Sequence, residues 1–423
     1  MDSAEKAERL LRDWKGEAYS FGCGVLGETG ALAARYGKRA LVVANRSAWL
    51  SPIVERVRES LSILGLKVIG DCVGARPNTP REDVYAIEDA IESARPEVIV
   101  AIGAGSTLDA TKAAAAIAAA APGSHNVEAL FGAGKVSQAL GGKRVTPLVA
   151  VETAASSGSH LTKYSNVSDV AAGQKKLIID ERIVPPAAVF DYAVTASSPH
   201  ELTLDGAFDG MSHCLEVYYG AKGPALDKVE EIALTGIELI ISSVRAAVTI
   251  PHNLEARHRL GLGTDLGGYA IMAGSTSGGH LTSFSLVDVT THGRATSIMN
   301  PYYTVLFAEA IERQLRHVAL IYERAGALKA DVSKLEGRDL GIAVAEAMIA
   351  FAAGLGAPTS LRQLDGFSEA HIERALAAAK DPTLSSKLQA MPIPMDAAMI
   401  DKYMRALLEA AAAGDLTQVL TLS

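Results

Sequence analysis

Two side chains that commonly bind metal ions lie one helical turn apart in the segment FDGMSHCLEVYY at 208–219. Asp209 and His213 are four residues apart, so both side chains leave the same face of the segment if it is helical. Apolar residues flank the pair, which predicts a buried helix. Because a buried carboxylate or imidazole needs a partner, the pair is a candidate half of a metal site.

Two more histidines, His280 and His292, follow in a segment of small residues, SGGHLTSFSLVDVTTHGRATSIMNP. One carboxylate and three imidazoles make a complete ligand set for a divalent metal, and such nitrogen and oxygen ligands suit Fe²⁺ or Zn²⁺. The predicted metal ligands are Asp209, His213, His280 and His292. We expect the remaining histidines to be satisfied in the core or exposed: His125, His200, His252, His258, His317 and His371.

A glycine-rich turn joins a predicted strand to a predicted helix in VIVAIGAGSTLDATKAAAA. Gly103 and Gly105 let the backbone approach a ligand closely, and the amides at the start of a helix favour a pyrophosphate. Ser106 and Thr107 add hydroxyl donors. A plain strand-to-helix turn can have the same pattern. A second glycine turn, FGCGVLGETG, precedes the first strong strand and favours a dinucleotide-binding function.

The end of the first strong strand bears on the choice between NAD and NADP. The run ALVVANRS ends in Asn45 and Arg46 and carries no acidic residue. An acid at this point accepts a hydrogen bond from the ribose of NAD, whereas an arginine suits the 2′-phosphate of NADP. The sequence therefore favours NADP slightly over NAD, with a solvated loop arginine as the alternative interpretation.

The organisation of the chain changes near residue 195. Before it, near-continuous apolar runs alternate with helical patterns, as in strands buried on both faces of a parallel sheet. These runs lie at 39–45, 66–73, 97–103, 145–151 and 187–192. Beyond it, long helical periodicities dominate. We predict a Rossmann-like, doubly wound, mostly parallel α/β domain at 1–195 that binds NAD(P), and an all-helical metal-binding domain at 196–423.

Composition excludes several classes of protein. The chain has 423 residues, 49% of them hydrophobic and 21% charged, with a formal net charge of −8, so it lacks the basic surface typical of nucleic-acid or anionic-lipid binding. Its longest apolar run is shorter than the roughly 20 residues of a membrane span. The N-terminus lacks a secretory signal pattern, and three widely spaced cysteines predict no disulfide framework. We expect a cytoplasmic protein with a small-molecule partner.

Seven segments in the same order resemble those of the iron-containing (group III) alcohol dehydrogenase family. FGCG, GAGSTLDATKA and TAASSGS are similar to its cofactor segments, RPNTP to its Pro-Asn loop after the second strand, and FDGMSHCLEVYYG to its Asp-x-x-x-His metal helix. THGRATSIMNPYY resembles its His-Gly segment, and LGAPTSLRQL its Pro-Thr-x-Leu signature. The resemblance implies a dehydroquinate synthase-like architecture and hydride transfer between NAD(P)(H) and a small primary alcohol or aldehyde. It also implies a homodimer or higher homo-oligomer.

The resemblance also implies roles for single residues. By position, Gly105, Ser106, Thr153 and Ser156 would contact the cofactor, and Asp109 would lie near the nicotinamide. The complete set predicted to bind the cofactor is Asn45, Arg46, Gly103, Gly105, Ser106, Thr107, Asp109, Thr153 and Ser156. The residues predicted to be catalytic are Asp109 and His280. The metal would act as a Lewis acid on the substrate oxygen.

Three departures from the family pattern are visible. Ala104 replaces the middle of three glycines, and His160 replaces an acidic residue that usually follows the TGS-like segment. The family often has two histidines four apart before the last ligand, whereas this chain has only His280, twelve residues before His292. His280 is thus either the third ligand, which we favour, or a proton relay. Asp288 is a weaker rival ligand.

Two alternative functions remain open from the sequence. A dehydroquinate-synthase-type lyase also joins a nucleotide domain to a metal-bearing helical domain, but it needs several cations around an anionic substrate. The stretch 196–300 supplies few, with Arg259 and Arg294 the plausible ones. A metal- or nucleotide-binding relative without activity is the other alternative, because a fold alone does not establish a function.

Overall fold

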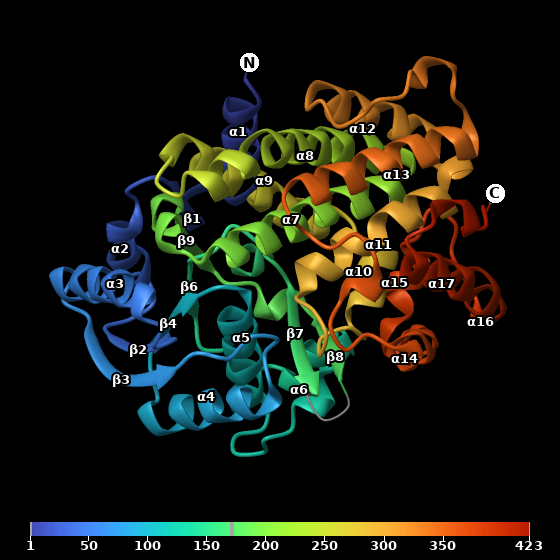
Figure 1. Ribbon diagram of the computed structural model, residues 1–423. Coiled ribbons are helices and arrows are strands. Elements are labelled where there is room, and N and C mark those ends of the chain that lie inside the picture. The colour runs from blue at the N-terminus through green and yellow to red at the C-terminus, as the bar shows by residue number, and fades with distance from the viewer. Residues whose placement is uncertain (1, 170–172, 423) are drawn as a thin grey trace. The chain divides into compact units, whose positions relative to one another are not determined.

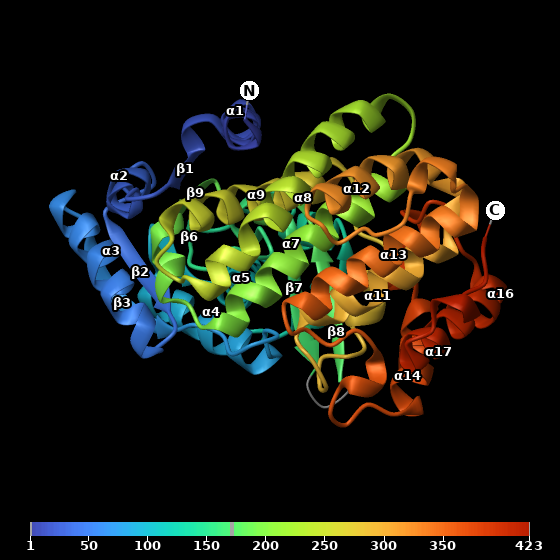
Figure 2. The ribbon, with the colours of Figure 1, turned by 45° about the horizontal axis from the view of Figure 1, so that its top comes forward.

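The protein is described by a computed structural model that covers residues 2–169 and 173–422 (Figures 1 and 2). Its internal contacts form two compact units. The sheet unit comprises Glu8–Thr203 and Ala246–Gly261, and the helical unit comprises the other described residues. These units divide the chain by contact, so the boundary that we expect between residues 195 and 196 stays a prediction.

A six-stranded parallel sheet forms the centre of the sheet unit, in the order β1-β9-β6-β4-β2-β3. Its strands are β1 (Tyr19–Gly22), β2 (Arg39–Ala44), β3 (Lys67–Val73), β4 (Val98–Gly103), β6 (Leu148–Glu152) and β9 (Ala187–Asp191). The five apolar runs correspond to five of these strands. Strand β1 was not predicted, because four residues are too few to show a pattern.

The side chains of each strand alternate between the two faces of this sheet, and helices cover both faces. Val42, Val100 and Val149 pack in one core with residues of α2 (Thr29–Ala33) and α3 (Ser51–Ile63). Further along the chain, α4 (Arg81–Ala94) packs against β3 and α5 (Gly105–Ala120) packs against β4. Figure 1 shows the blue helices α2 and α3 on one side of the strands and α4 and α5 on the other. The doubly wound α/β fold is confirmed.

A small second sheet in the same unit was not predicted. Its order is β5-β8-β7, with β5 (Gly132–Ala133), β7 (Tyr164–Asp169) and β8 (Gln174–Ile179). Strands β7 and β8 are antiparallel, from the pair Tyr164 and Ile179 to the pair Asp169 and Gln174. The polar sequence YSNVSD escapes a search for continuous apolar runs because only part of the strand is buried.

The described residues of the helical unit contain helices and no strands, which confirms the all-helical prediction for this part of the fold. The helices that bear on the site are α7 (His200–Gly220), α8 (Leu226–Thr249), α9 (Leu254–Ala273), α10 (Gly278–Ser283), α11 (His292–Leu306), α12 (Glu312–Arg324), α13 (Gly337–Gly354) and α15 (Ser385–Gln389). Helix α7 is buried along most of its length, as its apolar flanks predict.

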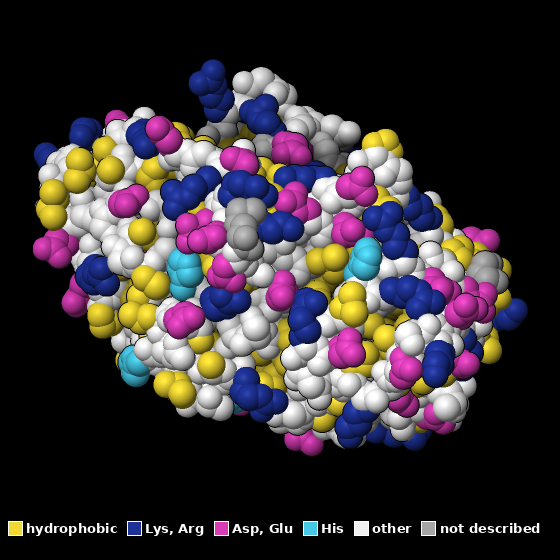
Figure 3. All heavy atoms as spheres, turned by 90° about the horizontal axis from the view of Figure 1, so that it is seen from above, with side chains coloured by type: hydrophobic (Ala, Val, Ile, Leu, Met, Phe, Trp, Pro, Cys, Tyr) yellow, Lys and Arg dark blue, Asp and Glu magenta, His cyan; other side chains and the backbone are white. Residues whose placement is uncertain are grey.

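One helical stretch in the described residues, Gly223–Thr249, is long and apolar enough to cross a membrane. However, 67% of its most apolar window is buried inside the protein, as in the core helix of a globular domain. On the face drawn in Figure 3, Lys and Arg side chains are interspersed with Asp and Glu, so this face presents no continuous basic patch.

Candidate metal centre and cofactor loop

The candidate metal centre starts on helix α7, where Asp209 and His213 occupy one face. Both side chains are buried, and His213 Nε2 lies 3.6 Å from Asp209 Oδ1. The α-helical period brings side chains at i and i+4 together. The structure therefore places these two predicted residues side by side, and their role as metal ligands stays a prediction.

Close backbone approaches around Asp209 bring other helices to this point. A Cβ added to Gly210 would lie 2.8 Å from Thr264 on α9, and one added to Gly267 would lie 2.8 Å from the Gly210 carbonyl oxygen. Gly293, the second residue of α11, sits so close to the Asp205 carbonyl on α7 that no side chain fits. This contact brings the first residue of α11, His292, to Asp209.

Three imidazoles converge on one carboxylate oxygen. Asp209 Oδ1 lies 3.6 Å from Nε2 of His280 and 3.5 Å from Nε2 of His292, in addition to its contact with His213. The imidazole rings of His213 and His280 are stacked with their centroids 4.8 Å apart. Asp209 Oδ1 and His280 Nε2 are buried and have no hydrogen-bond partner in the described residues.

These unpaired buried atoms fit a divalent cation. A buried polar atom without a partner costs free energy, so it usually has a bound ion or water beside it. Asp209, His280 and His292 form a group whose ligand atoms all lie within 4.8 Å of one another. One carboxylate oxygen and imidazole nitrogens are the ligand types of Fe²⁺ and Zn²⁺ sites. The chemistry of the donor set therefore agrees with a metal at this point.

Two residues that the sequence did not single out hold the imidazoles in place. Glu216, one further turn along α7, accepts a hydrogen bond from His280 Nδ1 at 2.8 Å and one from the Ser277 amide at 2.7 Å. Ser283 Oγ lies 2.9 Å from His292 Nδ1. When Nδ1 of His280 donates to a carboxylate, Nε2 keeps its lone pair for a metal. This geometry supports His280 as a ligand.

The charges of the cluster shift its pKa values. Burial acts to raise the pKa of Asp209, but the nearby His213 and His292 hold it far below its usual range. Burial lowers the pKa of His213 to about 4. Burial acts to lower the pKa of His280, but the nearby Glu216 carboxylate acts to raise it, and the net result is a raised pKa. Asp209 is therefore ionised and His213 is neutral near pH 7, as metal ligands must be, whereas the raised pKa of His280 favours its protonated form, so a metal would compete with a proton at that residue.

The rival ligand Asp288 lies outside this cluster of ligand atoms. Its carboxylate forms an ion pair with the Arg374 guanidinium, with one Nη1–Oδ2 contact of 3.1 Å. Most of the remaining histidines also have partners elsewhere, and His252 is exposed. These partners are Asp89 for His125, Glu201 for His200, Glu8 for His258, Glu230 for His317 and Ser368 for His371.

In the sheet unit, the predicted phosphate loop follows strand β4 and begins helix α5. The amides of Thr107 and Leu108 donate to the Ala104 carbonyl at 3.0 and 3.3 Å, so the helix starts directly after the turn. The first amides of a helix have no intrahelical acceptor and suit an anion. A Cβ on Gly105 would meet Ser157 Oγ at 2.5 Å, which shows that the 153–159 segment lies against this turn.

Asp109 and Lys112 fasten that second segment to helix α5. Asp109 accepts hydrogen bonds from Ser159 Oγ at 2.5 Å and from the Asn166 amide at 2.9 Å. The buried Lys112 ammonium donates to the Ser159 carbonyl at 2.9 Å and also to the carbonyls of Thr162 and Tyr164. Both oxygens of Asp109 are thus engaged with the protein. The sequence predicted this residue near the site but not its anchoring contacts.

A buried group at the end of β6 holds the start of the same segment. Glu152 Oε1 accepts from the Thr153 and Ala154 amides, both at 3.0 Å, and Oε2 lies 3.2 Å from His160 Nδ1. The Tyr19 hydroxyl lies 3.1 Å from the other nitrogen of His160. The Thr153 hydroxyl is buried without a partner among the described residues. Ser156, the other predicted cofactor residue of this segment, is partly exposed.

The other predicted cofactor residues lie at the ends of parallel strands. The Asn45 side chain donates to the Ala75 carbonyl at 3.0 Å and accepts from the Arg46 amide at 3.1 Å. Arg46 is exposed, and its guanidinium has no ion pair within the described part of the chain. Asp191, which the sequence did not reveal, accepts from the Gly24 amide at 2.8 Å and so fixes the FGCG turn.

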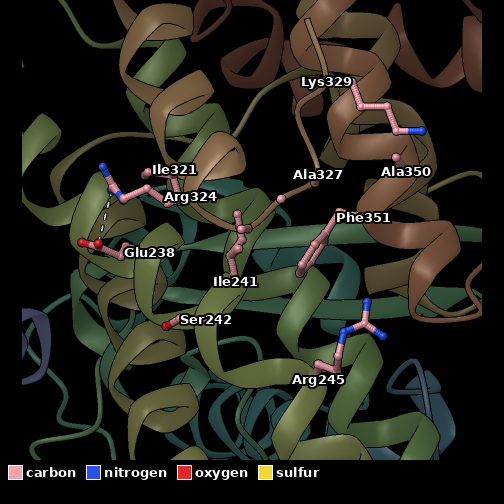
Figure 4. Close-up of a pocket in the computed structure, with 12 residues that line it drawn as sticks. Glu238, Ile241, Ser242, Arg245, Ile321, Arg324, Ala327, Lys329, Ala350 and Phe351 are labelled. Atoms are coloured by element: carbon pink, nitrogen blue, oxygen red, sulfur yellow. Dashed lines mark hydrogen bonds and ion pairs between the residues drawn. The ribbon is translucent and has the colours of Figure 1, made fainter.

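A separate pocket of about 510 Å³ in the helical unit is lined by none of the predicted site residues (Figure 4). Apolar side chains of Ile241 and Phe351 lie between cations from α8, α12 and the segment after it, and Arg324 pairs with Glu238 at 3.2 Å. It offers no set of metal ligands. The candidate metal ligands therefore lie in the cluster around Asp209 and not in this pocket.

Comparison with known families identifies the chain. The profile described as "Iron-containing alcohol dehydrogenase" matches residues 16–192, and the profile "Fe-containing alcohol dehydrogenase family, C-terminal" matches residues 203–407. The chain belongs to the iron-containing alcohol dehydrogenase family. The resemblance of the seven segments is confirmed, and the chain is an oxidoreductase of this family. The lyase alternative is not favoured by these matches.

Individual relatives agree with the family. The NAD-dependent methanol dehydrogenase of Bacillus methanolicus is 28% identical over 301 residues, which span 70% of this chain and 76% of that protein. The 1,3-propanediol dehydrogenase of Citrobacter freundii is 26% identical over 342 residues, spanning 79% and 83%. The solved alcohol dehydrogenase from Oenococcus oeni has a TM-score of 0.78 at 22% identity and covers 93% of this chain and 98% of its own. This last likeness shows the fold.

Proposed function

We propose that the protein transfers hydride between a nicotinamide cofactor and a small primary alcohol or aldehyde, and that it uses Fe²⁺ for this reaction. The same ligands would accept Zn²⁺ in place of Fe²⁺. The named relatives support this substrate class and the use of NAD. In this proposal the metal ligands are Asp209, His213, His280 and His292. We further propose that the protein is cytoplasmic and forms a homodimer or higher homo-oligomer.

One observation carries the proposal. Three imidazole nitrogens from α7, α10 and α11 surround Asp209 Oδ1 at 3.5–3.6 Å, and the carboxylate oxygen is buried without a hydrogen-bond donor in the described structure. Such a cluster is costly without a cation, because a buried carboxylate oxygen and a buried imidazole nitrogen have no hydrogen-bond partner among the described residues. With a divalent cation, the same atoms become its ligands.

The residues of the chain prepare this chemistry in defined ways. A bound divalent metal would supply Lewis acidity at the substrate oxygen and so favour loss or uptake of hydride at the adjacent carbon. Glu216 orients His280 and sets which nitrogen carries its proton, and Ser283 orients His292. The apolar ring of Phe284 stacks on His292, with ring centroids 5.9 Å apart, and keeps water from that side.

The sheet unit would hold the cofactor. Gly103, Gly105, Ser106 and Thr107 form the turn that receives the pyrophosphate at the start of α5. Thr153 and Ser156 contribute hydroxyls from the adjacent segment. Asp109 orders that segment through Ser159 and Asn166, so its role in the reaction is positioning.

The preference between NADP and NAD depends on Asn45 and Arg46 in this proposal. The exposed guanidinium of Arg46 is available for a 2′-phosphate, so we propose a slight preference for NADP. The test compares the KM values for NADPH and NADH in wild type and in Arg46→Ala. We expect the variant to lose affinity for NADPH about tenfold, the scale of one charge-assisted hydrogen bond, and to keep its affinity for NADH. An unchanged ratio refutes this role of Arg46.

The decisive experiment measures metal content and turnover together. Protein purified without oxygen is analysed for iron and zinc and assayed by nicotinamide absorbance with a panel of alcohols and aldehydes. We expect about one metal per chain in wild type, its loss in His280→Ala, and no turnover in His213→Ala or His292→Ala, with nucleotide binding intact. Metal retained in His280→Ala would make His280 a proton relay instead.

The same assay separates the alternative functions. A lyase that regenerates its NAD would convert substrate without a net change in nicotinamide absorbance. A relative without activity would bind metal and nucleotide but convert nothing on the panel. Wild-type turnover in the two ligand variants would refute the metal assignment itself.

A further inference from the structure

One imidazole contacts side chains from three neighbouring strands of the large sheet. His160 is 1% exposed, and its Nδ1 lies 3.2 Å from Oε2 of Glu152, the last residue of β6. Its Nε2 lies 3.1 Å from the hydroxyl of Tyr19, the first residue of β1. Strand β9 lies between these two (Figure 1), and its Phe190 ring meets the imidazole edge-on, with ring centroids 5.5 Å apart. His160 therefore links the end of β6 to the start of β1 across β9.

The donors and acceptors of this link match. Oε1 of Glu152 accepts from the backbone amides of Thr153 and Ala154, both at 3.0 Å. Oε2 accepts from Nδ1–H of His160, because a carboxylate only accepts, and the neutral imidazole then keeps Nε2 as the acceptor for the Tyr19 hydroxyl. An acidic side chain at position 160, which the family pattern usually has, could not donate to Glu152 and would add a like charge beside it. A histidine at this position thus suits the buried Glu152 of this chain.

Both ends of this link lead into segments that the proposed function assigns to the cofactor. Glu152 fixes the first amides of the TAASSGS segment, whose Thr153 hydroxyl is buried without a partner among the described residues. Tyr19 begins the strand that runs into the FGCG turn. In a parallel sheet, ligands bind at the carboxyl ends of the strands, and both segments leave the sheet at that edge. One buried imidazole thus joins the two candidate cofactor segments.

Other contacts hold the same parts of the chain without the imidazole. The ammonium of Lys15, at the end of α1 (Ser3–Lys15), donates to the carbonyl of Leu161 at 2.9 Å. Ser159 is held in turn by side chains of α5. Because these contacts do not involve the side chain of His160, a change of that side chain leaves the segment attached on both sides of it. Only the link between β6 and β1 is then lost.

We propose that His160 is a positioning residue for cofactor binding. By tying the TAASSGS segment to β1, it holds the Thr153 hydroxyl and the FGCG backbone in place for the same dinucleotide. This inference rests on the cofactor site of the proposed function. It concerns affinity for the cofactor and not the hydride step, because His160 is buried and acts only through its neighbours. Loss of such a residue raises the KM for the cofactor and leaves kcat unchanged once the cofactor saturates.

The test measures the dissociation constants of NADH and NADPH by fluorescence titration and follows the cofactor that wild type binds more tightly. His160→Phe keeps a ring against Phe190 but has no nitrogen, and we expect about tenfold weaker binding, the scale of one buried hydrogen bond. His160→Gln, whose amide donates and accepts, should stay within about threefold of wild type. Tyr19→Phe removes only the hydroxyl and should weaken binding about threefold. Added to His160→Phe, it should change nothing further, because the link is already broken.

Val57→Ala, in the core of the same unit, is the control for lost stability. It should lower the urea midpoint of unfolding but keep the wild-type affinity for the cofactor. With the panel substrate that wild type converts fastest, the KM for the cofactor in His160→Phe should rise about tenfold while kcat stays within about twofold. Wild-type affinity in His160→Phe and Tyr19→Phe, or a lower kcat at an unchanged KM, overturns the inference, and Tyr19→Phe decides alone if His160→Phe does not fold. If wild type binds neither cofactor, the proposed function fails instead.

Discussion

The contact between Glu216 and His280 allows a sharp prediction for Glu216→Gln. The carboxylate accepts three hydrogen bonds, from His280 Nδ1 at 2.8 Å, from the Ser277 amide at 2.7 Å and from the His280 amide at 3.4 Å. Glutamine has nearly the same shape but only one acceptor oxygen, so at least one of these donors loses its partner. An unsatisfied buried donor costs about 1–3 kcal/mol, which we expect as the loss in the free energy of unfolding of the metal-free protein.

The same change acts on metal binding through the proton of His280. If Nδ1 no longer donates to a carboxylate, the proton can reside on Nε2, the nitrogen that lies 3.6 Å from Asp209 Oδ1. Metal binding must then displace that proton. The loss of the Glu216 negative charge also weakens the electrostatic attraction between the site and the metal ion. Changes at such outer contacts typically cost about 10–100-fold in metal affinity, so we expect a loss of that size for Zn²⁺ in Glu216→Gln.

Two measurements check this prediction. Chelator competition gives the dissociation constant for Zn²⁺, and urea unfolding of the metal-free protein gives its stability. Glu346→Gln, at an exposed glutamate on α13, is the control and should change neither value by more than about 0.5 kcal/mol. If Glu216→Gln loses stability but keeps wild-type Zn²⁺ affinity, then Glu216 only supports the fold, and the argument from the His280 proton is refuted.

Three further predictions follow from the packing and from buried lysines. Gly293→Ala places a Cβ against the Asp205 carbonyl, so the start of α11 must move. We expect a loss of about 1–3 kcal/mol in the free energy of unfolding, measured with urea, and at least about tenfold weaker Zn²⁺ binding. The control Gly27→Ala, whose added Cβ would meet no atom within 4 Å, should change neither value. Lys112→Met removes the ammonium that donates to three carbonyl oxygens of the 159–164 segment. We expect a loss of about 2–4 kcal/mol in the free energy of unfolding and weaker NADH binding, measured by fluorescence. Unchanged NADH affinity would show that other contacts hold this segment. Burial lowers the pKa of Lys387 to about 8, below its value in the unfolded chain, so the folded protein binds fewer protons than the unfolded one between about pH 8 and 10.4. The free energy of unfolding of the wild type should therefore rise by about 3 kcal/mol relative to that of Lys387→Met across this window. Urea unfolding measures both free energies as a function of pH, and an equal pH dependence of the two proteins would contradict the shift.

Local patterns in the sequence were enough for most of the elements of the large sheet and for the placement of two residues of the candidate metal site. Strands buried on both faces need continuous apolar runs, which made β2, β3, β4, β6 and β9 visible. The helical period alone put Asp209 and His213 on one face of α7. The order of the seven segments was enough to recognise the family, because motif order depends only on the chain.

Tertiary structure decided the rest of the site, because its parts are far apart in the chain. The choice between His280 and Asp288 depends on which side chain reaches Asp209, and Arg374 holds Asp288 elsewhere. Nothing in the local pattern around Glu216 shows that it accepts a hydrogen bond from an imidazole 64 residues away. The buried charge of Lys387 was equally hidden, since a lysine in the sequence SSKLQ is typical of an exposed helix. Only the packing of α7, α10, α11 and α15 brings these charges within reach of one another, and the low polarity of that interior makes their balance matter.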